Sequence, residues 1–227
     1  MKDTKNSEVW EGIFASRESG KYPPISLVRF IAKNYYATND RSSIKILEIG
    51  SGAGPNIWYL VREGFTAFGI DSSPTGCEKT TARIRNDGLD QGRFKVLVGD
   101  YLEKIDYFDD NYFDAIIDIE SLYLNSFEDS KKMIEKCFSK LKHGGLLFSQ
   151  TFSEKTSGLH GEEITYHVVK PVDGPLKNTG FARYTTKSDI HSLYKQENNS
   201  IKGIELQELN TVNGDLISEW LIEIEKN

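Results

Sequence analysis

The sequence has little cysteine and no long apolar segment. Its 227 residues include two cysteines, Cys77 and Cys137, which form no Cys-x-x-Cys pair. This excludes a disulfide-stapled scaffold and fits a reducing compartment. No apolar run approaches the about 18 residues that a membrane span requires. Residues 1–8 hold no apolar signal region, so we expect a cytoplasmic protein without a membrane partner.

Positive charge is also scarce. The chain carries 28 lysines and arginines against 34 aspartates and glutamates, a formal charge of −6 at pH 7. A net negative charge disfavours a broad phosphate-binding surface, so nucleic acid is not an expected partner. Of the four histidines, His160 and His167 are the closest pair, and no third ligand accompanies them. We therefore predict no metal site.

The most informative segment is a short apolar strand that leads into alternating glycines. Ile44–Ile49 has the composition and length of a buried parallel strand, and Gly50, Gly52 and Gly54 follow it. A proline then occupies the first position of a helix predicted over residues 56–63. Glycine permits positive φ and close approach of a ligand, and the helix N-terminus offers unpaired N–H groups. The turn therefore predicts a nucleotide-sized cradle.

Carboxylates follow at the ends of the next two predicted strands. Residues 66–70 are apolar and end at Asp71, and residues 94–98 are followed by Gly99 and Asp100. The carboxyl ends of parallel strands meet at one edge of a sheet, so both acids should lie near the glycine turn. One carboxylate can accept the hydroxyls of a ribose, and the other can accept a hydrogen bond from an exocyclic amine such as that of adenine.

A nicotinamide-dependent oxidoreductase is the main alternative. Its fingerprint is Gly-x-Gly-x-x-Gly with an acid about 20 residues further on, and Asp71 fits the acid. The third glycine would fall on Pro55 when counted from Gly50, and on Ile57 when counted from Gly52. Because both counts fail, the spacing disfavours a dinucleotide.

Together with two further segments, these motifs resemble the class I S-adenosylmethionine-dependent methyltransferases, and among them the small-molecule methyltransferases. The resemblance covers about residues 7–227, and its segments are Glu48–Gly54, Gly69–Pro74, Val98–Asp100, Phe113–Asp118 and Leu141–Leu147. It implies S-adenosylmethionine as cofactor, S-adenosylhomocysteine as product, and a small-molecule acceptor that reacts through oxygen or nitrogen, such as a sugar or another metabolite. The alternative of another class is a non-catalytic or regulatory module that binds the adenosyl nucleotide.

The resemblance also implies the fold, an α/β three-layer αβα sandwich. Its sheet has seven strands and is mostly parallel, with the last strand antiparallel. Residues 1–227 would then form one domain, as a monomer or homodimer, with an N-terminal helical segment over 7–36. The pattern of residues predicts helices over 7–19, 25–36, 74–86, 128–141 and 186–195, and later strands over 114–118, 146–152, 202–210 and 216–225.

Cofactor-binding residues follow from the same resemblance. Gly50, Gly52 and their neighbours would contact the methionine end, and Glu48 would orient the turn. Asp71 would bind the ribose and Asp100 the adenine. The full set of implied cofactor-binding residues is Trp10, Glu48, Gly50, Ser51, Gly52, Gly54, Asp71, Ser72, Asp100, Tyr101 and Asp118.

Catalytic residues are harder to predict, because the sulfonium already activates its methyl group. Positioning alone can lower such a barrier by about 7–11 kcal/mol, so a base is needed only for some nucleophiles. Alternation puts Asp118 and Glu120 on one face of their strand, where they could reach the cleft or cap the following turn. Histidine, with an ordinary pKa of about 6.5, suits an oxygen nucleophile better. The catalytic candidates are therefore His160, His167 and Glu120.

Two segments could cover the site. Residues 153–183 show no clear helix or strand pattern and follow the strand over 146–152, at the sheet edge of the glycine turn. We predict a lid or insert there; the alternative is a solvated loop or an additional hairpin. In the N-terminal segment, Trp10, Phe14 and Tyr22 could sit over the cofactor or could pack the helices onto the sheet.

Overall fold

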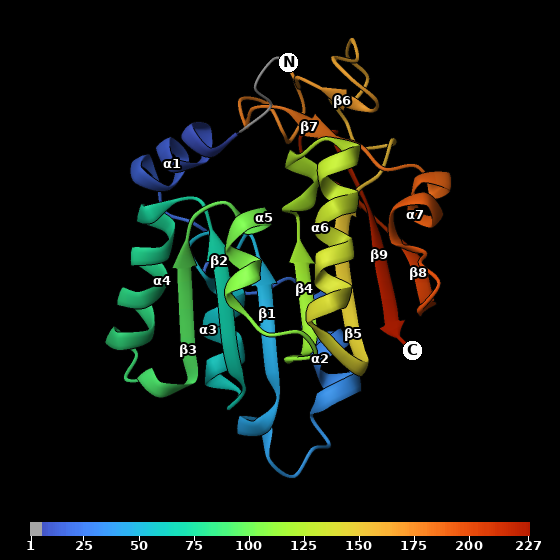
Figure 1. Cartoon of the computed structure of the whole chain (residues 1–227). Helices are drawn as coiled ribbons and strands as arrows, with labels where there is room; N and C mark the ends of the chain where they lie inside the picture. Colours follow the sequence, from blue (N-terminus) through green and yellow to red (C-terminus); the bar gives the residue numbers. More distant parts are fainter. Residues whose placement is uncertain (1–5) are drawn as a thin grey trace.

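The computed structural model of the chain describes residues 6–227 and shows three layers, with helices on both faces of a central sheet (Figure 1). The strands of this sheet are β1 (Lys45–Ile49), β2 (Thr66–Asp71), β3 (Phe94–Val98), β4 (Phe113–Ile119), β5 (Leu141–Phe152), β8 (Asn199–Asn210) and β9 (Leu216–Lys226). Their order is β3-β2-β1-β4-β5-β9-β8. Strands β1 to β5 pair in parallel, and β9 runs antiparallel to both β5 and β8. The predicted sandwich, with its antiparallel last strand, is confirmed.

Three helices cover each face of the sheet. Helices α2 (Ile25–Tyr35), α3 (Pro55–Arg62) and α4 (Pro74–Asn86) share one apolar cluster, and α5 (Tyr101–Lys104), α6 (Phe127–Lys140) and α7 (Lys187–Tyr194) share the other. Helix α1 (Ser7–Ser16) lies beyond the sheet edge, beside α4 (Figure 1). Four 3-10 turns cover Arg41–Ser43, Gln91–Arg93, Ile105–Tyr107 and Leu122–Leu124. Among the described residues, no helix combines the length and the apolar character needed to cross a membrane.

The alternation of side chains along the strands explains the two cores. In β1, Ile46 packs against the α2–α3–α4 face, whereas Leu47 and Ile49 pack against the opposite face. Successive side chains of a strand point to opposite faces, so a doubly covered strand must be apolar at almost every position. Phe30 of α2 stacks on Phe148 of β5, with ring centroids 4.6 Å apart.

Some elements differ from the prediction. Helix α1 ends at Ser16 rather than near residue 19, because Arg17 has an extended backbone with φ −143° and ψ 161°. Strand β5 begins at Leu141 rather than at residue 146, and its first residues pair with β4 through an irregularity between Phe113 and Ala115. Polar residues and two glycines in this stretch hide the strand pattern in the sequence. The short helix α5 was not predicted.

Residues 153–183 form an ordered addition rather than a solvated loop. They include a two-stranded antiparallel sheet of β6 (Val168–Val169) and β7 (Ala182–Arg183), which lies near α1 at the top of Figure 1. Leu159, Val169 and Leu176 build a separate buried cluster with Phe152 of β5. The segment therefore rests on the carboxyl-end edge of the sheet through an apolar core of its own.

The aromatic stack between α2 and β5 makes a testable contribution to stability. Phe30→Ala should lower the free energy of unfolding by about 3–5 kcal/mol, because it leaves a cavity against Phe148. Urea denaturation measures this change. The control Val212→Ala, at a fully exposed position, should stay within about 0.5 kcal/mol of the unmodified chain. Equal stability of the two variants would contradict the packing described here.

Candidate active site

A cavity of about 740 Å³ opens at the carboxyl-end edge of the sheet. Its walls come from the glycine turn after β1, the ends of β2, β3 and β4, helix α1 and the loop over residues 19–24. Trp10, Phe14 and Tyr22 all line it. Of the two hypotheses for these aromatic residues, the structure agrees with the one that places them over the site. Among residues 6–227, no group of three potential metal ligands comes together.

The backbone angles and close neighbours of the turn after β1 leave no room for a side chain at Gly50 or Gly52. Gly50 and Gly52 have φ of +70° and +51°, a region that side chains disfavour. A Cβ on Gly52 would lie 2.9 Å from the Phe14 ring, and one on Gly50 would lie 1.8 Å from the Ser121 hydroxyl. The turn is also tied to β2, because the N–H groups of Gly50 and Ser51 donate to the Ile70 carbonyl over 2.8 and 3.1 Å. These contacts fix its shape before any ligand binds.

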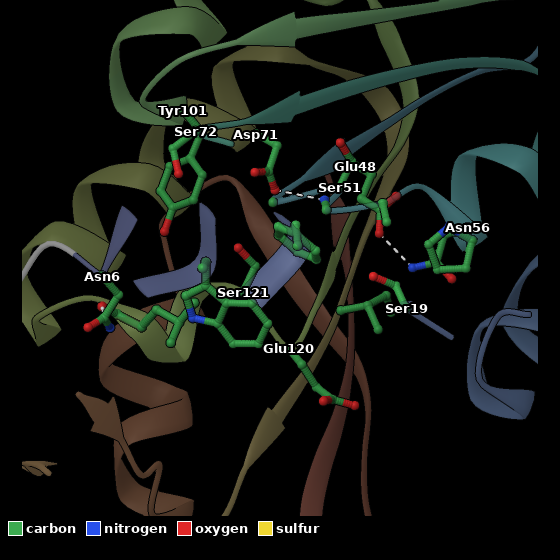
Figure 2. Close-up of a pocket in the computed structure, with 18 of the residues that line it drawn as sticks. Asn6, Ser19, Glu48, Ser51, Asn56, Asp71, Ser72, Tyr101, Glu120 and Ser121 are labelled. Atoms are coloured by element: carbon green, nitrogen blue, oxygen red, sulfur yellow. Dashed lines mark hydrogen bonds between the residues drawn. The ribbon is translucent and has the colours of Figure 1, made fainter. Parts of the chain in front are cut away.

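The Asp71 carboxylate joins this turn to the start of α4. One oxygen accepts a hydrogen bond from the Gly52 N–H over 2.7 Å (Figure 2). The other accepts one from the Ser73 N–H over 2.8 Å. Burial raises the pKa of Asp71, and these two backbone N–H groups act in the opposite direction. A carboxylate oxygen can accept more than one hydrogen bond, so Asp71 retains capacity for ligand hydroxyls.

Four buried polar atoms without partners belong to residues that line the cavity. Glu48 accepts a 2.6 Å hydrogen bond from Asn56 through Oε1, but its Oε2 has no partner. The Ser51 hydroxyl, the Asn56 Oδ1 and the Trp10 Nε1 are likewise buried and unpaired. Burial raises the pKa of Glu48 well above its ordinary value. Such atoms are rare in proteins, and four on residues that line one cavity indicate a place for a polar ligand.

The third strand end contributes Asp100 and Tyr101. Asp100 caps α5 by accepting a 2.9 Å hydrogen bond from the Leu102 N–H, and Tyr101 is hydrogen-bonded to Asn125. Figure 2 shows Tyr101 and Ser72 close to Asp71, on one side of the cavity. The structure thus brings the three predicted strand ends together.

Two of the predicted cofactor-binding residues do not line the cavity. Gly54 caps α3 in a left-handed conformation. Asp118 is fully buried and accepts hydrogen bonds from the Ser121 and Leu122 N–H groups and, over 2.6 Å, from the Ser149 hydroxyl. Asp118 therefore caps the turn after β4, and burial raises its pKa to about 6.

Glu120 does line the cavity, and its backbone is strained. Its φ is +52°, which is uncommon for a residue other than glycine and costs free energy. Its Oε1 accepts a hydrogen bond from Gln150 Nε2 over 3.2 Å. Its side chain is exposed within the open cavity, and partial desolvation by the cavity walls together with the neighbouring carboxyl of Glu219 raises the pKa of Glu120.

The two predicted catalytic histidines lie outside the cavity. His160 is exposed, and His167 is stacked between Tyr166 and Tyr184 with its Nδ1 2.8 Å from Asp189 Oδ2. Through these contacts His167 attaches the segment 153–183 to α7. No residue of that segment lines the cavity either. Of the three catalytic candidates, only Glu120 is placed at the site.

Helix α1 covers the cavity instead and is anchored at its start and in its middle. At its start, the Asn6 side chain exchanges hydrogen bonds with the backbone of Phe181, of 2.8 and 3.0 Å. Along its length, Glu11 accepts hydrogen bonds from the hydroxyls of Ser73 and Thr75 at the start of α4. The segment 153–183 therefore reaches the site indirectly, by holding the helix that covers it.

Comparison with known proteins agrees with this geometry. Residues 46–145 match the family model of the methyltransferase domain. This match covers the segment from β1 to the first part of β5 and supports a methyltransferase domain in this chain. A ubiquinone biosynthesis O-methyltransferase from Rickettsia canadensis (strain McKiel) is 24% identical to it over 199 residues, which are 87% of this chain and 78% of the relative. An S-adenosyl-L-methionine-dependent Diels–Alderase from Neonectria sp. (strain DH2) is 29% identical over 146 residues, which are 63% of this chain and 54% of the relative.

Solved structures show the same architecture. An S-adenosylmethionine-dependent methyltransferase from Methanosarcina mazei superposes with a TM-score of 0.70 at 22% identity, over 86% of this chain and 96% of the other. The likeness confirms the predicted class I fold. The resemblance found in the sequence motifs is thereby confirmed.

Sequence reasoning missed several polar residues of the methyltransferase site. Asn6, Ser19, Asn56, Ser121 and Asn125 all line the cavity. Ser121 directly follows Glu120 and could have been found by its place at a strand end. Asn6 and Ser19 belong to the covering segment, and no residue pattern marks the side on which such a segment packs.

The Asp71 carboxylate gives a direct test of the site. Asp71→Ala should weaken S-adenosylmethionine binding by about 1–3 kcal/mol, the cost of losing a buried hydrogen-bonding carboxylate. Isothermal titration calorimetry measures the affinity, with thermal melting to verify the fold. Asp109→Ala, at an exposed acid outside the cavity, is the matched control and should bind normally. Unchanged affinity in a folded Asp71→Ala variant would place the cofactor elsewhere.

Proposed function

We propose that the chain transfers a methyl group from S-adenosylmethionine to an oxygen or nitrogen atom of a small-molecule acceptor. One observation carries this proposal: a single cavity holds both a polar cradle at the glycine turn and, apart from it, a strained carboxylic acid, Glu120. Figure 2 shows Glu120 well apart from Asp71 and Tyr101. The cavity therefore offers one region for a donor and another for an acceptor.

The residues of the cradle fit the proposed cofactor. Its methionine end carries an ammonium and a carboxylate, and the unpaired atoms of Glu48, Ser51, Asn56 and Trp10 provide acceptors and a donor for such groups. Asp71 would accept the ribose hydroxyls, with Ser72 beside it. Asp100 and Tyr101 would contact the adenine, since both line the cavity at the end of β3. Gly54 and Asp118 would act through the turns that they shape.

The protein's part in the reaction is positioning and proton transfer. When bound, the cofactor supplies a methyl group already activated by the sulfonium. Helix α1 would exclude water by covering the glycine turn with Trp10 and Phe14. Glu120 would orient the acceptor and accept its proton, because its carboxyl is the one placed on the acceptor side.

The same features bear on the domain organisation, the cellular location and the partners of the enzyme. We infer a single domain over 1–227, in which 7–36 covers the site and 153–183 acts as a support for the lid formed by α1. We also infer a cytoplasmic location, which the two buried free thiols of Cys77 and Cys137 support. Four acidic residues and no lysine or arginine line the described cavity, which disfavours nucleic acid as the acceptor.

Cofactor consumption tests this function. We expect S-adenosylhomocysteine to bind with micromolar or tighter affinity and NAD to show no measurable binding, since the glycine spacing does not fit a dinucleotide. Incubation with methyl-labelled S-adenosylmethionine and a panel of metabolites should then transfer label to at least one acceptor.

Two outcomes would contradict the proposal. Tight NAD binding without S-adenosylhomocysteine binding would favour an oxidoreductase. Tight S-adenosylhomocysteine binding without label transfer to any compound of the panel would favour a binding module, or a use of the cofactor without methyl transfer.

A further inference from the structure

Glu120 belongs to a pair of carboxyl groups that share one amide. We propose that the acceptor is an amine whose nitrogen binds at Glu120, and that Glu219, linked to Glu120 through Gln150, is a positioning residue that keeps Glu120 ready to take a proton from that nitrogen. The inference rests on the proposed methyl transfer and names the acceptor class and a second residue of the acceptor region.

The geometry of the pair is set by Gln150. This side chain is 2% exposed, and its Oε1 accepts a 2.5 Å hydrogen bond from the Ser26 hydroxyl. Its amide nitrogen is thereby directed at the acids, with 3.0 Å to each oxygen of Glu219 and 3.2 Å to Glu120 Oε1. Glu219, on β9, is 4% exposed and does not line the cavity, whereas Glu120 does.

Two acids this close cannot both ionise at low cost. Both carboxyls accept a hydrogen bond from the same amide nitrogen, which places them side by side. Asp118 on β4 and the Tyr123 hydroxyl also act on Glu120, and neither supplies positive charge. The neighbouring carboxyl of Glu219 therefore favours the protonated form of Glu120. A cation entering from the cavity would stabilise the ionised form.

The charge of the cavity selects the class of acceptor. Glu48, Asp71, Asp100 and Glu120 line it, and among the described lining residues there is no lysine, arginine or histidine. The first three lie on the cofactor side, so Glu120 is the acid left for the acceptor. Among the described protein groups of the cavity, a carboxylate or phosphate on the acceptor would meet only acids, whereas an ammonium group would donate a charge-assisted hydrogen bond to Glu120.

An amine also suits the proton chemistry of Glu120. The amine enters as an ammonium ion and gives one proton to the ionised Glu120 carboxylate, which frees the lone pair of the nitrogen. That lone pair forms the N–C bond to the methyl group as the C–S bond breaks, and the bonding electrons stay on sulfur. The products are a methylated ammonium ion, S-adenosylhomocysteine and protonated Glu120, which returns its proton to water. A carboxylic acid with a raised pKa is better matched to this step than an ordinary one.

The charge preference is testable without knowing the natural acceptor. The chain is saturated with S-adenosylhomocysteine, and the binding of benzylamine, benzyl alcohol and benzoate is compared by calorimetry at about pH 8. We expect benzylamine to bind about tenfold or more tightly than the alcohol, and benzoate to show no binding. Equal or tighter binding of the alcohol or of benzoate, or no binding of benzylamine, would overturn the inference. Failure of S-adenosylhomocysteine itself to bind would instead overturn the proposed function.

Variants separate the roles of the two acids. Glu120→Gln should weaken benzylamine binding about tenfold and leave S-adenosylhomocysteine binding unchanged. Glu219→Gln should retain binding at about pH 8 and shift the acid limb of the benzylamine pH profile to lower pH, because the negative neighbour that raises the pKa of Glu120 is gone. The control is Glu205→Gln at an exposed acid, which should change neither the affinity for benzylamine nor its pH profile.

If the pH profile of benzylamine binding is unchanged in Glu219→Gln, Glu219 has only a structural role, which would overturn its assignment as a positioning residue. If that variant does not fold, the titration of Glu120 in the unmodified chain still tests the inference. Carbon-13 NMR of labelled glutamate carboxyls, with the Glu120 signal assigned by Glu120→Gln, should show Glu120 titrating well above the usual range around 4.3. An ordinary titration midpoint for Glu120 would overturn the paired-carboxyl inference.

Discussion

The two hydrogen bonds that Asp71 accepts from Gly52 and Ser73 are the interaction on which the site depends. They join the glycine turn of β1 to the start of α4 at the edge of the sheet. Helix α1 is fastened to the same place, because Glu11 accepts hydrogen bonds from Ser73 and Thr75. A single buried carboxylate thus holds the cradle in shape and positions the surface on which its cover rests. Any ligand that uses Asp71 would bind to a group already ordered by the fold.

The acidic residues that line the cavity differ in their surroundings. Glu48 is buried against Asn56, Asp71 faces backbone N–H groups, and Glu120 is paired with another acid across an amide. Glu120 is held at positive φ, and the surrounding strands must stabilise this strained conformation. Its backbone N–H donates to the Gln150 carbonyl over 2.9 Å, so the residue that orients its carboxyl also fixes its main chain. Gln150 therefore holds both the main chain and the carboxyl of Glu120.

Local sequence features predicted the parts of the molecule in which local rules decide structure. Apolar strands, the glycine turn and the acids at strand ends were all recognisable, since parallel topology brings strand ends to one edge. The function of residues 153–183 was not recognisable, because His167 packs against Tyr166, Tyr184 and Asp189 and His160 is exposed, so neither histidine lines the cavity. The partnership of Glu120 with Glu219 was also out of reach, since it depends on β9 pairing beside β5. Long-range pairing of this kind leaves no local pattern.

The most direct test of the central claim is a crystal structure of the chain with S-adenosylhomocysteine. The account predicts ribose hydroxyls on Asp71, the homocysteine end at Glu48, Ser51 and Asn56, and the sulfur directed toward the side of the cavity where Glu120 lies. The previously unpaired atoms of the cradle should acquire partners in that structure. Ligand bound outside the cavity, or bound with its adenosine at Glu120, would contradict the account.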